Sequence, residues 1–277
     1  PLYRHAGRAH DQSAGVGPVI DSAFTLLDSK LPVLATAIHA GHRLGPEMDH
    51  HCGIPEADRF REEDPYTDEA AALFANHIIL RSSRFEVDLN RLRDKAVYLV
   101  PEDCWGLPVS RQNLPPHIIA SLYSEYDQWY AHLDFCIKRM LSHHPFIVVL
   151  DLHSYNHRRG GPNAQPDPQE SNPDIIIGRS NMSARYHKSV ESLRARLDGQ
   201  SWQGRKLDCR ADVKFPGGYL ARYLNAHYSD HLFCLAIEFK KTFMDEWTGQ
   251  LDRDAWDKLK GLFKTAVDEW LPEVVRA

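Results

Sequence analysis

The sequence predicts an α/β fold of three layers, with helices on both faces of a mainly parallel or mixed central sheet. Short apolar runs alternate with longer segments of helical periodicity, which is the pattern of βαβ units. The chain has 277 residues, 43% hydrophobic and 26% charged, as in ordinary globular proteins. One α/β domain can reach this length, and no linker divides the chain. We therefore expect a loose arm over residues 1–15 and a single domain over residues 16–277.

The predicted elements follow from apolar runs, helical periodicity and turn residues. The expected strands are short apolar runs at residues 31–38, 97–100, 146–150, 174–178 and 232–237. Three helices are expected at residues 115–142, 182–197 and 254–274. A further helix should begin with Asp64 as N-cap and Pro65 in the first helical position, before the apolar segment 70–79. Residues 41–63, rich in Gly, Pro, Asp and His, predict a long irregular loop of the kind that often carries function.

Composition excludes several classes of protein. No run approaches the roughly 18 apolar residues of a membrane span, and the polar N-terminal segment lacks the apolar core of a secretion signal. A net charge of −5 argues against nucleic acid or an anionic membrane as the main partner. The five cysteines form no CxxC pair and are odd in number, which favours a reducing cytoplasm. The oligomeric state stays open.

Side chains that bind metals follow three of the predicted strands. The first strand leads into His39 and His42, the strand at 146–150 into Asp151 and His153, and the last into Glu238. In open α/β sheets, ligands bind beyond the carboxyl ends of the strands, where these groups would meet. A catalytic zinc needs three protein ligands, an open position for water and a nearby carboxylate. Singly, each residue has an ordinary explanation, such as a helix cap for Asp64, but the joint pattern favours a metal site.

Other polar residues allow two interpretations each. Asp151 and His153 are expected on the same side of a strand. Asp151 therefore either contacts the His153 imidazole and fixes its tautomer, or only forms a turn. Arg84, Arg91 and Arg222 either clamp substrate carboxylates or are surface charges. The loop 155–173 is either a lid or a solvated basic loop.

Five stretches of the chain carry a resemblance to one family. They are VLATAIHAGHRL (33–44), SRFEVDLNR (83–91), VVLDLHS (148–154), GGYLARYL (217–224) and LAIEFKKTFMDE (235–246). In order and spacing they resemble the N-formylglutamate amidohydrolase family over about residues 31–248. The resemblance implies a zinc carboxypeptidase-like hydrolase with a phosphorylase/hydrolase-like α/β fold, and a place in histidine degradation. The basic segment after His153 and the Lys240-Lys241 pair depart from the family's usual pattern.

The resemblance also assigns roles by position. His39 and His153 match the family's metal histidines, and Asp64, about 25 residues after His39, matches the acidic third ligand. The alternatives for that third position are His42, Glu47 and Asp68. Glu238 matches the catalytic carboxylate. The positions that would bind substrate carboxylates are Arg84, Asn90, Arg91 and Arg222.

The activity that this resemblance implies is metal-dependent hydrolysis of the N-acyl amide of an acidic amino acid. The expected substrate is a small acyl amino acid such as N-formyl-L-glutamate, and the expected metal is zinc, although Mn, Fe and Co accept the same ligands. The alternatives on the same fold are a zinc carboxypeptidase, a peptidoglycan amidase or another N-acyl-amino-acid deacylase. A protein of another class, which binds a metal or ligand without catalysis, is a third hypothesis.

Overall fold

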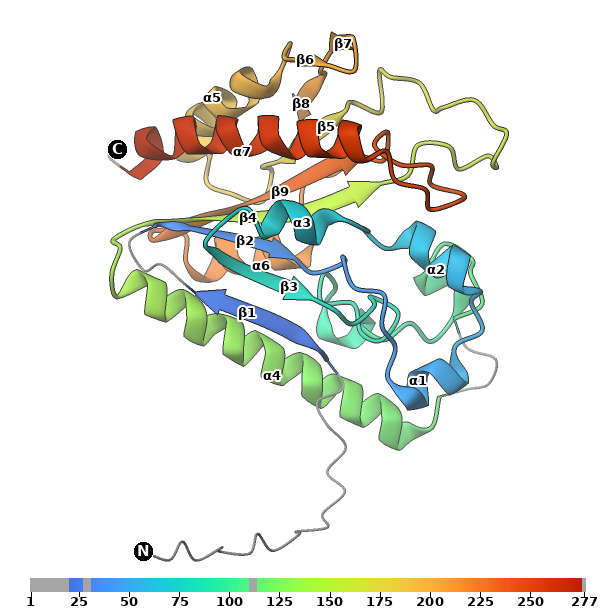
Figure 1. The fold of residues 1–277 in the computed structure, drawn as a ribbon. Helices are drawn as coiled ribbons and strands as arrows, with labels where there is room; N and C mark the ends of the chain where they lie inside the picture. Colours follow the sequence, from blue (N-terminus) through green and yellow to red (C-terminus); the bar gives the residue numbers. More distant parts are fainter. Residues whose placement is uncertain (1–19, 27–30, 110–113, 276–277) are drawn as a thin grey trace, which may run out of the picture.

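A seven-stranded sheet runs through the middle of the molecule (Figure 1). In the computed structural model, which describes residues 20–26, 31–109 and 114–275, its strand order is β1-β3-β2-β4-β9-β5-β8. The pairs β1–β3 and β5–β9 are antiparallel and the other pairs are parallel, so the sheet is mixed. Its strands are β1 (Ser22–Leu26), β2 (Val33–Ala37), β3 (Asn76–Leu80), β4 (Ile147–Tyr155), β5 (Ile175–Gly178), β8 (Cys209–Ala211) and β9 (Leu232–Lys240). A small hairpin pairs β6 (Ser201–Trp202) with β7 (Arg205–Lys206).

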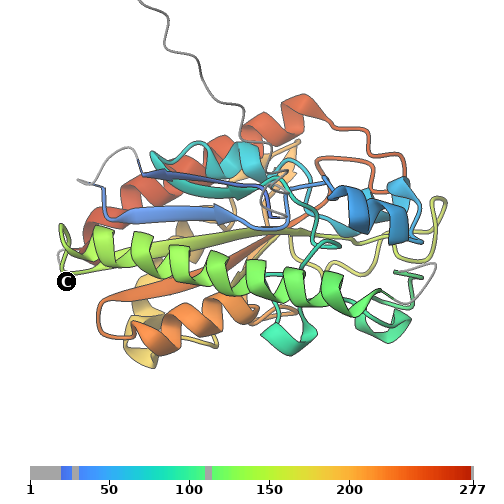
Figure 2. The same cartoon turned by 90° about the horizontal axis from the view of Figure 1, so that it is seen from below.

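Helices cover both faces of this sheet, which confirms the predicted three-layer α/β class. On one face lie α4 (Pro116–Leu141) and α6 (Tyr219–His227), and on the other lie α3 (Thr67–Ala71), α5 (His187–Leu197) and α7 (Arg253–Val275) (Figures 1 and 2). Two short helices, α1 (Pro46–His51) and α2 (Glu56–Glu62), follow β2. Single 3-10 turns span Arg93–Lys95, Pro101–Asp103 and Ala184–Tyr186.

Alternate residues of the central strands enter two separate hydrophobic cores. In β4, Val148 and Leu150 pack in the core that contains α5 and α7, whereas Ile147 and Val149 pack in the core that contains α4 and α6. Side chains two apart on a strand share a face. The same alternation therefore places His153 on the face of α4 and α6.

The helix predicted to begin at Asp64 is wrong. The helix α3 begins at Thr67 and has only five residues, because Tyr66 adopts a left-handed conformation (φ 70°) immediately before it. The rest of the apolar segment forms the strand β3, whose Ile78 side chain is fully buried. Pairing of β3 with β1 on one side and β2 on the other thus overrides the helical pattern of these residues.

Two further expectations are wrong, and a third concerns residues that the structure does not describe. Residues 41–63 are not one irregular loop, since they contain α1 and α2. Residues 97–100 lie in a loop rather than a strand. The predicted arm at residues 1–15 falls outside the described residues. The helices predicted at 115–142, 182–197 and 254–274 correspond to α4, to α5 with the preceding 3-10 turn, and to α7.

A glycine brings the segment after β3 against the segment after β2. Gly41 bridges to Ser83, and a Cβ on Gly41 would lie 2.3 Å from the carbonyl carbon of Arg81. Such an approach is possible only without a side chain. It positions the loop that begins at Ser83 beside the end of β2.

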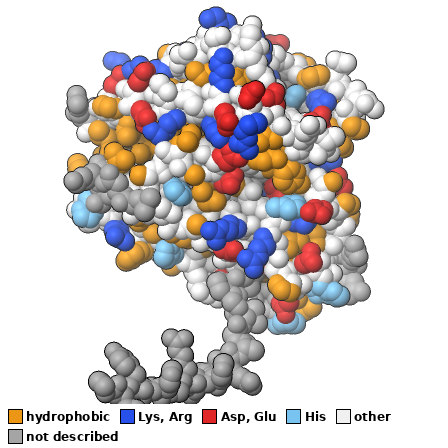
Figure 3. Space-filling model, in the orientation of Figure 1, with side chains coloured by type: hydrophobic (Ala, Val, Ile, Leu, Met, Phe, Trp, Pro, Cys, Tyr) orange, Lys and Arg blue, Asp and Glu red, His pale blue; other side chains and the backbone are white. Residues whose placement is uncertain are grey.

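Acidic and basic side chains are interspersed on the face shown in Figure 3. Within the described ranges, no helix combines the length and apolarity needed to cross a membrane.

The buried carboxyl of Glu86 predicts a measurable pH dependence of stability. Glu86 accepts the Gly45 N–H at 2.8 Å, and burial raises its pKa from 4.5 to about 7. Because the folded state holds this proton more tightly than the unfolded state, stability is lost as the pH rises from about 4.5 through about 7. Denaturant unfolding of Glu86→Gln should show less loss than wild type between pH 5 and 8, by about 2 kcal/mol. Identical pH profiles of the two proteins would contradict this assignment.

Candidate metal centre

Three buried side chains from distant parts of the chain meet at one end of the sheet. His39 lies two residues after β2, Asp64 lies between α2 and α3, and His153 lies within β4. One ligand atom from each lies within 4.8 Å of the other two. Among the described residues, this is the one group of His, Cys, Asp or Glu side chains found with metal-binding spacing.

The alternative third ligands lie elsewhere. The His42 Nδ1 is 2.5 Å from a Glu63 carboxylate oxygen, so it is engaged with α2 and the segment after it. Glu47 is exposed on α1, and Asp68 lines a different cavity between α3 and the β1–β3 edge. The geometry therefore supports Asp64 over these three residues.

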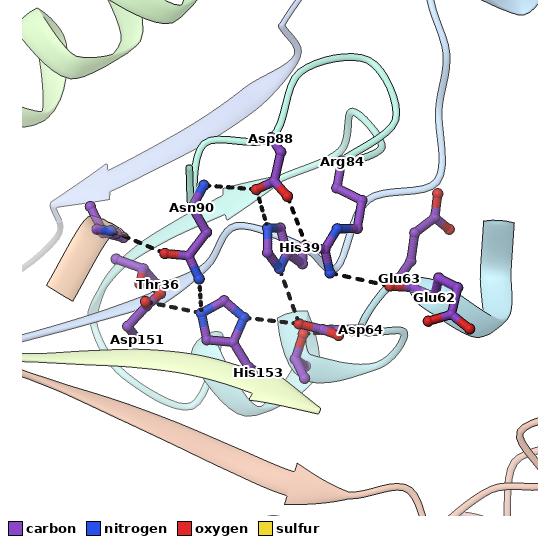
Figure 4. A network of polar contacts seen from close by, with 12 residues as sticks. Thr36, His39, Glu62, Glu63, Asp64, Arg84, Asp88, Asn90, Asp151 and His153 are labelled. Atoms are coloured by element: carbon purple, nitrogen blue, oxygen red, sulfur yellow. Dashed lines mark hydrogen bonds and ion pairs between the residues drawn. The ribbon is translucent and has the colours of Figure 1, made fainter. Parts of the chain in front are cut away.

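Both histidines present Nδ1 to Asp64 and turn Nε2 toward a second carboxylate (Figure 4). Asp64 Oδ2 lies 2.9 Å from His153 Nδ1 and 3.4 Å from His39 Nδ1. On the opposite side of the rings, His39 Nε2 is 2.8 Å from Asp88 and His153 Nε2 is 2.9 Å from Asp151. Metal-binding histidines usually donate their other ring N–H to a carboxylate or carbonyl, which fixes the tautomer. The arrangement thus has two imidazoles oriented for one centre.

The residue behind His39 was missed by sequence reasoning. Asp88 is fully buried and accepts hydrogen bonds from Arg84 Nη2 at 2.8 Å, from the Asn90 N–H at 2.8 Å and from the Tyr98 hydroxyl. Its position in the charged patch 84–91 was the available signal, but the predicted functional residues of that patch were Arg84, Asn90 and Arg91. No local pattern shows which carboxylate of that patch reaches His39.

Burial and close partners shift the pKa values of the cluster in opposite directions. Burial opposes the ionisation of Asp64, but hydrogen bonds with His153 and His39 outweigh it and hold its pKa well below the usual range. Burial also opposes protonation of His153, but Asp151 outweighs it and raises the pKa of His153 well above 6.5. Negative charge on Asp64 is therefore favoured between the two imidazoles, where a divalent cation can lie.

Glu238 lies beside this cluster on the neighbouring strand. β4 and β9 are parallel and place Glu238 in register with His153, so the two side chains share the face of α4 and α6. Both residues lie within their strands and not after them as predicted, because β4 and β9 continue beyond the apolar runs. Burial raises the pKa of Glu238 to about 8, with His153 acting in the opposite direction.

Lys241, another residue that sequence reasoning missed, holds the segment that carries Asp64. Its buried ammonium donates to the carbonyl oxygens of Arg61 and Glu63, at 2.6 Å each. The Asp64 N–H in turn donates to the His39 carbonyl at 2.9 Å. Lys240 instead donates to the Asn172 carbonyl at 2.7 Å and lies 3.5 Å from Asp174. Lys241 thus fixes the segment that carries Asp64, whereas Lys240 fixes the segment that contains Asn172 and Asp174.

The centre opens into a cavity of about 220 Å³, whose wall includes part of the predicted substrate-binding set. Arg84, Asn90 and Glu238 line it together with the three clustered side chains. Arg91 and Arg222 are not part of this wall. Arg91 lies 3.5 Å from Asp88, and Arg222 is exposed on α6, with its guanidinium near the Tyr219 ring.

Asn90 also fixes the start of α6. Its side-chain oxygen accepts the Leu220 N–H at 3.0 Å, and its amide nitrogen lies 3.4 Å from His153 Nε2. Gly218 makes this approach possible, since a Cβ there would lie 2.2 Å from the Asn90 amide. The glycine pair of the sequence thus packs α6 against the metal centre.

Comparisons with known proteins agree with this architecture. A crystal structure of N-formylglutamate amidohydrolase from Ralstonia eutropha JMP134 is similar, with a TM-score of 0.69, 16% identity, and coverage of 94% of this chain and 98% of that chain. A gene product of Agrobacterium tumefaciens is similar with a TM-score of 0.53, 16% identity, and coverage of 91% and 96%. No curated protein matches the sequence. The family model described as N-formylglutamate amidohydrolase matches residues 31–244, and the chain therefore belongs to that family.

Proposed function

We propose that the protein is a metal-dependent amidohydrolase that releases formate from N-formyl-L-glutamate. The observation that carries the proposal is the buried cluster of His39, Asp64 and His153, with Glu238 in register beside it. Family membership supports N-formylglutamate as the substrate. The simplest test is formate release by zinc-loaded protein, with release expected and its absence counting against the proposal.

The donor set fits a divalent metal. Two imidazole nitrogens and one carboxylate oxygen are a usual ligand set for catalytic zinc, and Mn, Fe or Co can also use it. Both imidazoles have their second nitrogen against a buried carboxylate, as ligating histidines require. When bound, such a metal supplies a Lewis acid that activates water and polarises the amide carbonyl.

In this reaction Glu238 moves the proton. Its carboxylate lines the cavity, and burial raises its pKa to about 8. A group whose pKa lies near the working pH can both accept and return a proton. It takes the proton from the attacking water and delivers it to the amide nitrogen, which leaves as an amine.

Arg84 is the best placed of the predicted residues to hold a substrate carboxylate. Its guanidinium lines the cavity, while Asp88 at 2.8 Å and the Glu62 carbonyl at 3.3 Å hold it in position. A guanidinium fixed in this way binds a carboxylate with little loss of entropy. Asn90 offers its amide beside it, and substrate contacts by Arg91 and Arg222 stay predictions.

The cysteines support our proposal that the protein acts in a reducing compartment, the cytoplasm. All five are buried, and those at positions 104, 136, 209 and 234 are free thiols. Disulfides are rare where thiols are kept reduced.

Replacing the proton carrier should separate turnover from metal binding. Glu238→Gln preserves size but removes the base, so kcat for formate release should fall by roughly 10²- to 10⁴-fold. Metal content, measured on the same samples, should equal that of wild type. Wild-type turnover in this variant would remove Glu238 from the mechanism.

Zinc should stabilise the protein through the three clustered side chains. At a zinc concentration of about 100 times Kd, the melting temperature of the metal-free protein should rise by roughly 5 to 10 °C. Asp64→Ala should lose this rise, whereas His50→Ala, an exposed histidine on α1, should keep it. An equal rise in all three proteins would place the metal elsewhere.

The carboxylate behind His39 should tune metal affinity. Asp88→Asn should weaken zinc binding by about 10- to 100-fold, because the imidazole loses its charged partner. Competition with a zinc chelator measures the affinity. The matched control is Asp174→Asn, which removes a buried carboxylate paired with Arg205, away from the centre, and should leave zinc affinity unchanged.

A further inference from the structure

A second cavity adjoins the one at the metal centre. It has a volume of about 180 Å³ and shares Glu62, Trp105, Asn156 and Arg159 with the first cavity. None of the predicted substrate-binding residues lines it. A ligand that extends from the metal centre toward this second cavity must therefore pass the shared side chains.

Two oxygen atoms in the wall of the first cavity have no hydrogen-bond partner among the described residues. The Ser154 Oγ and the Asn156 Oδ1 are buried without a hydrogen bond, and Asn156 is only 3% exposed. Both follow His153 in the chain and line the first cavity. Leaving a buried polar atom unpaired is unfavourable. The Ser154 hydroxyl can donate to a ligand carboxylate, whereas the Asn156 oxygen can only accept from a ligand donor.

Arg159 is the exposed charge at the same junction. Its guanidinium pairs with the Glu62 carboxylate at 3.0 and 3.3 Å, but its side chain is 45% exposed whereas that of Glu62 is 5% exposed. A half-exposed ion pair contributes little stability, and a guanidinium has five donors, so Arg159 can bind a second carboxylate at small cost. Arg61 lies 3.5 Å from the same Glu62, and the buried Glu246 also lines the second cavity, so two arginines and two carboxylates meet there.

The segment that carries Arg159 is anchored. The buried Glu246 carboxylate accepts the N–H groups of His157 at 2.8 Å and Arg158 at 2.7 Å. The Trp247 indole donates to the Arg158 carbonyl at 3.0 Å. These contacts hold the basic segment, which departs from the family pattern, at the mouth of the cavity.

We propose that Arg159 forms the subsite that binds the side-chain carboxylate of the substrate's amino acid. The inference rests on the proposed function and extends it, because Arg84 then serves the α-carboxylate near the metal centre. Arg159 is a specificity residue in this account and takes no part in proton transfer.

The test compares N-formyl-L-glutamate with its neutral isostere N-formyl-L-glutamine. Arg159→Met should lower kcat/KM for the glutamate substrate by about 10- to 100-fold, mainly through KM, the loss expected for a charged hydrogen-bonding contact. For the glutamine substrate the change should stay within about threefold. Arg158→Met is the matched control, since Arg158 pairs with Asp245 at 2.6 Å and lines neither cavity, and it should keep the preference. Equal losses on both substrates in Arg159→Met would overturn the proposal.

A second variant and a binding measurement make the outcome independent of turnover. Asn156→Asp adds a negative charge at the junction and should shift the preference toward glutamine. Calorimetry with L-glutamate and L-glutamine should show a preference for glutamate in wild type and none in Arg159→Met. If wild type releases no formate but shows this binding preference, the proposed function fails and the subsite stands. If wild type hydrolyses the substrate but binds both amino acids equally, the subsite is overturned.

Discussion

Each imidazole of the centre is held between two carboxylates, and the rest of the site depends on this constraint. His39 lies between Asp64 and Asp88, and His153 lies between Asp64 and Asp151. Burying so many charges is unfavourable unless they are paired and hydrogen-bonded. The surroundings supply that pairing, since Thr36 donates to Asp151 at 2.7 Å and Arg84 to Asp88 at 2.8 Å. A centre built in this way is a preorganised site for a cation, with both Nδ1 atoms turned to the same point.

The sheet explains why these groups meet. β4 lies between β2 and β9 and is parallel to both, so residues near the carboxyl ends of these strands gather at the same end of the sheet. The register between β4 and β9 places Glu238 next to His153 without any loop between them. Strands hold side chains more rigidly than loops do, which suits the proton transfer that we propose for Glu238.

Features that depend on local sequence pattern, such as runs of apolar residues, could be predicted from the sequence. The apolar runs before His39, His153 and Glu238 identified three neighbouring strands, and the family resemblance supplied Asp64. The helix expected from Asp64 failed because distant residues decide that segment. Its carboxylate is engaged by His153, and the Lys241 ammonium holds the backbone immediately before it.

The same reason explains the residues that were missed. Asp88 contacts His39 and Arg159 contacts Glu62 across the fold, and nothing in their immediate sequence separates them from surface polar residues. Asp88 in particular is separated from His39 by 49 residues. Contacts of this range depend on the packing of loops after strands, which periodicity and composition do not encode.

The most direct test of the central claim is the position of zinc in crystals of the loaded protein, located by anomalous scattering at the zinc edge. The account predicts one peak at about 2.0–2.1 Å from Nδ1 of both His39 and His153 and at about 2.0–2.2 Å from an Asp64 oxygen. Zinc bound through Nε2 of either histidine, or fully occupied at another place with this cluster empty, would contradict it.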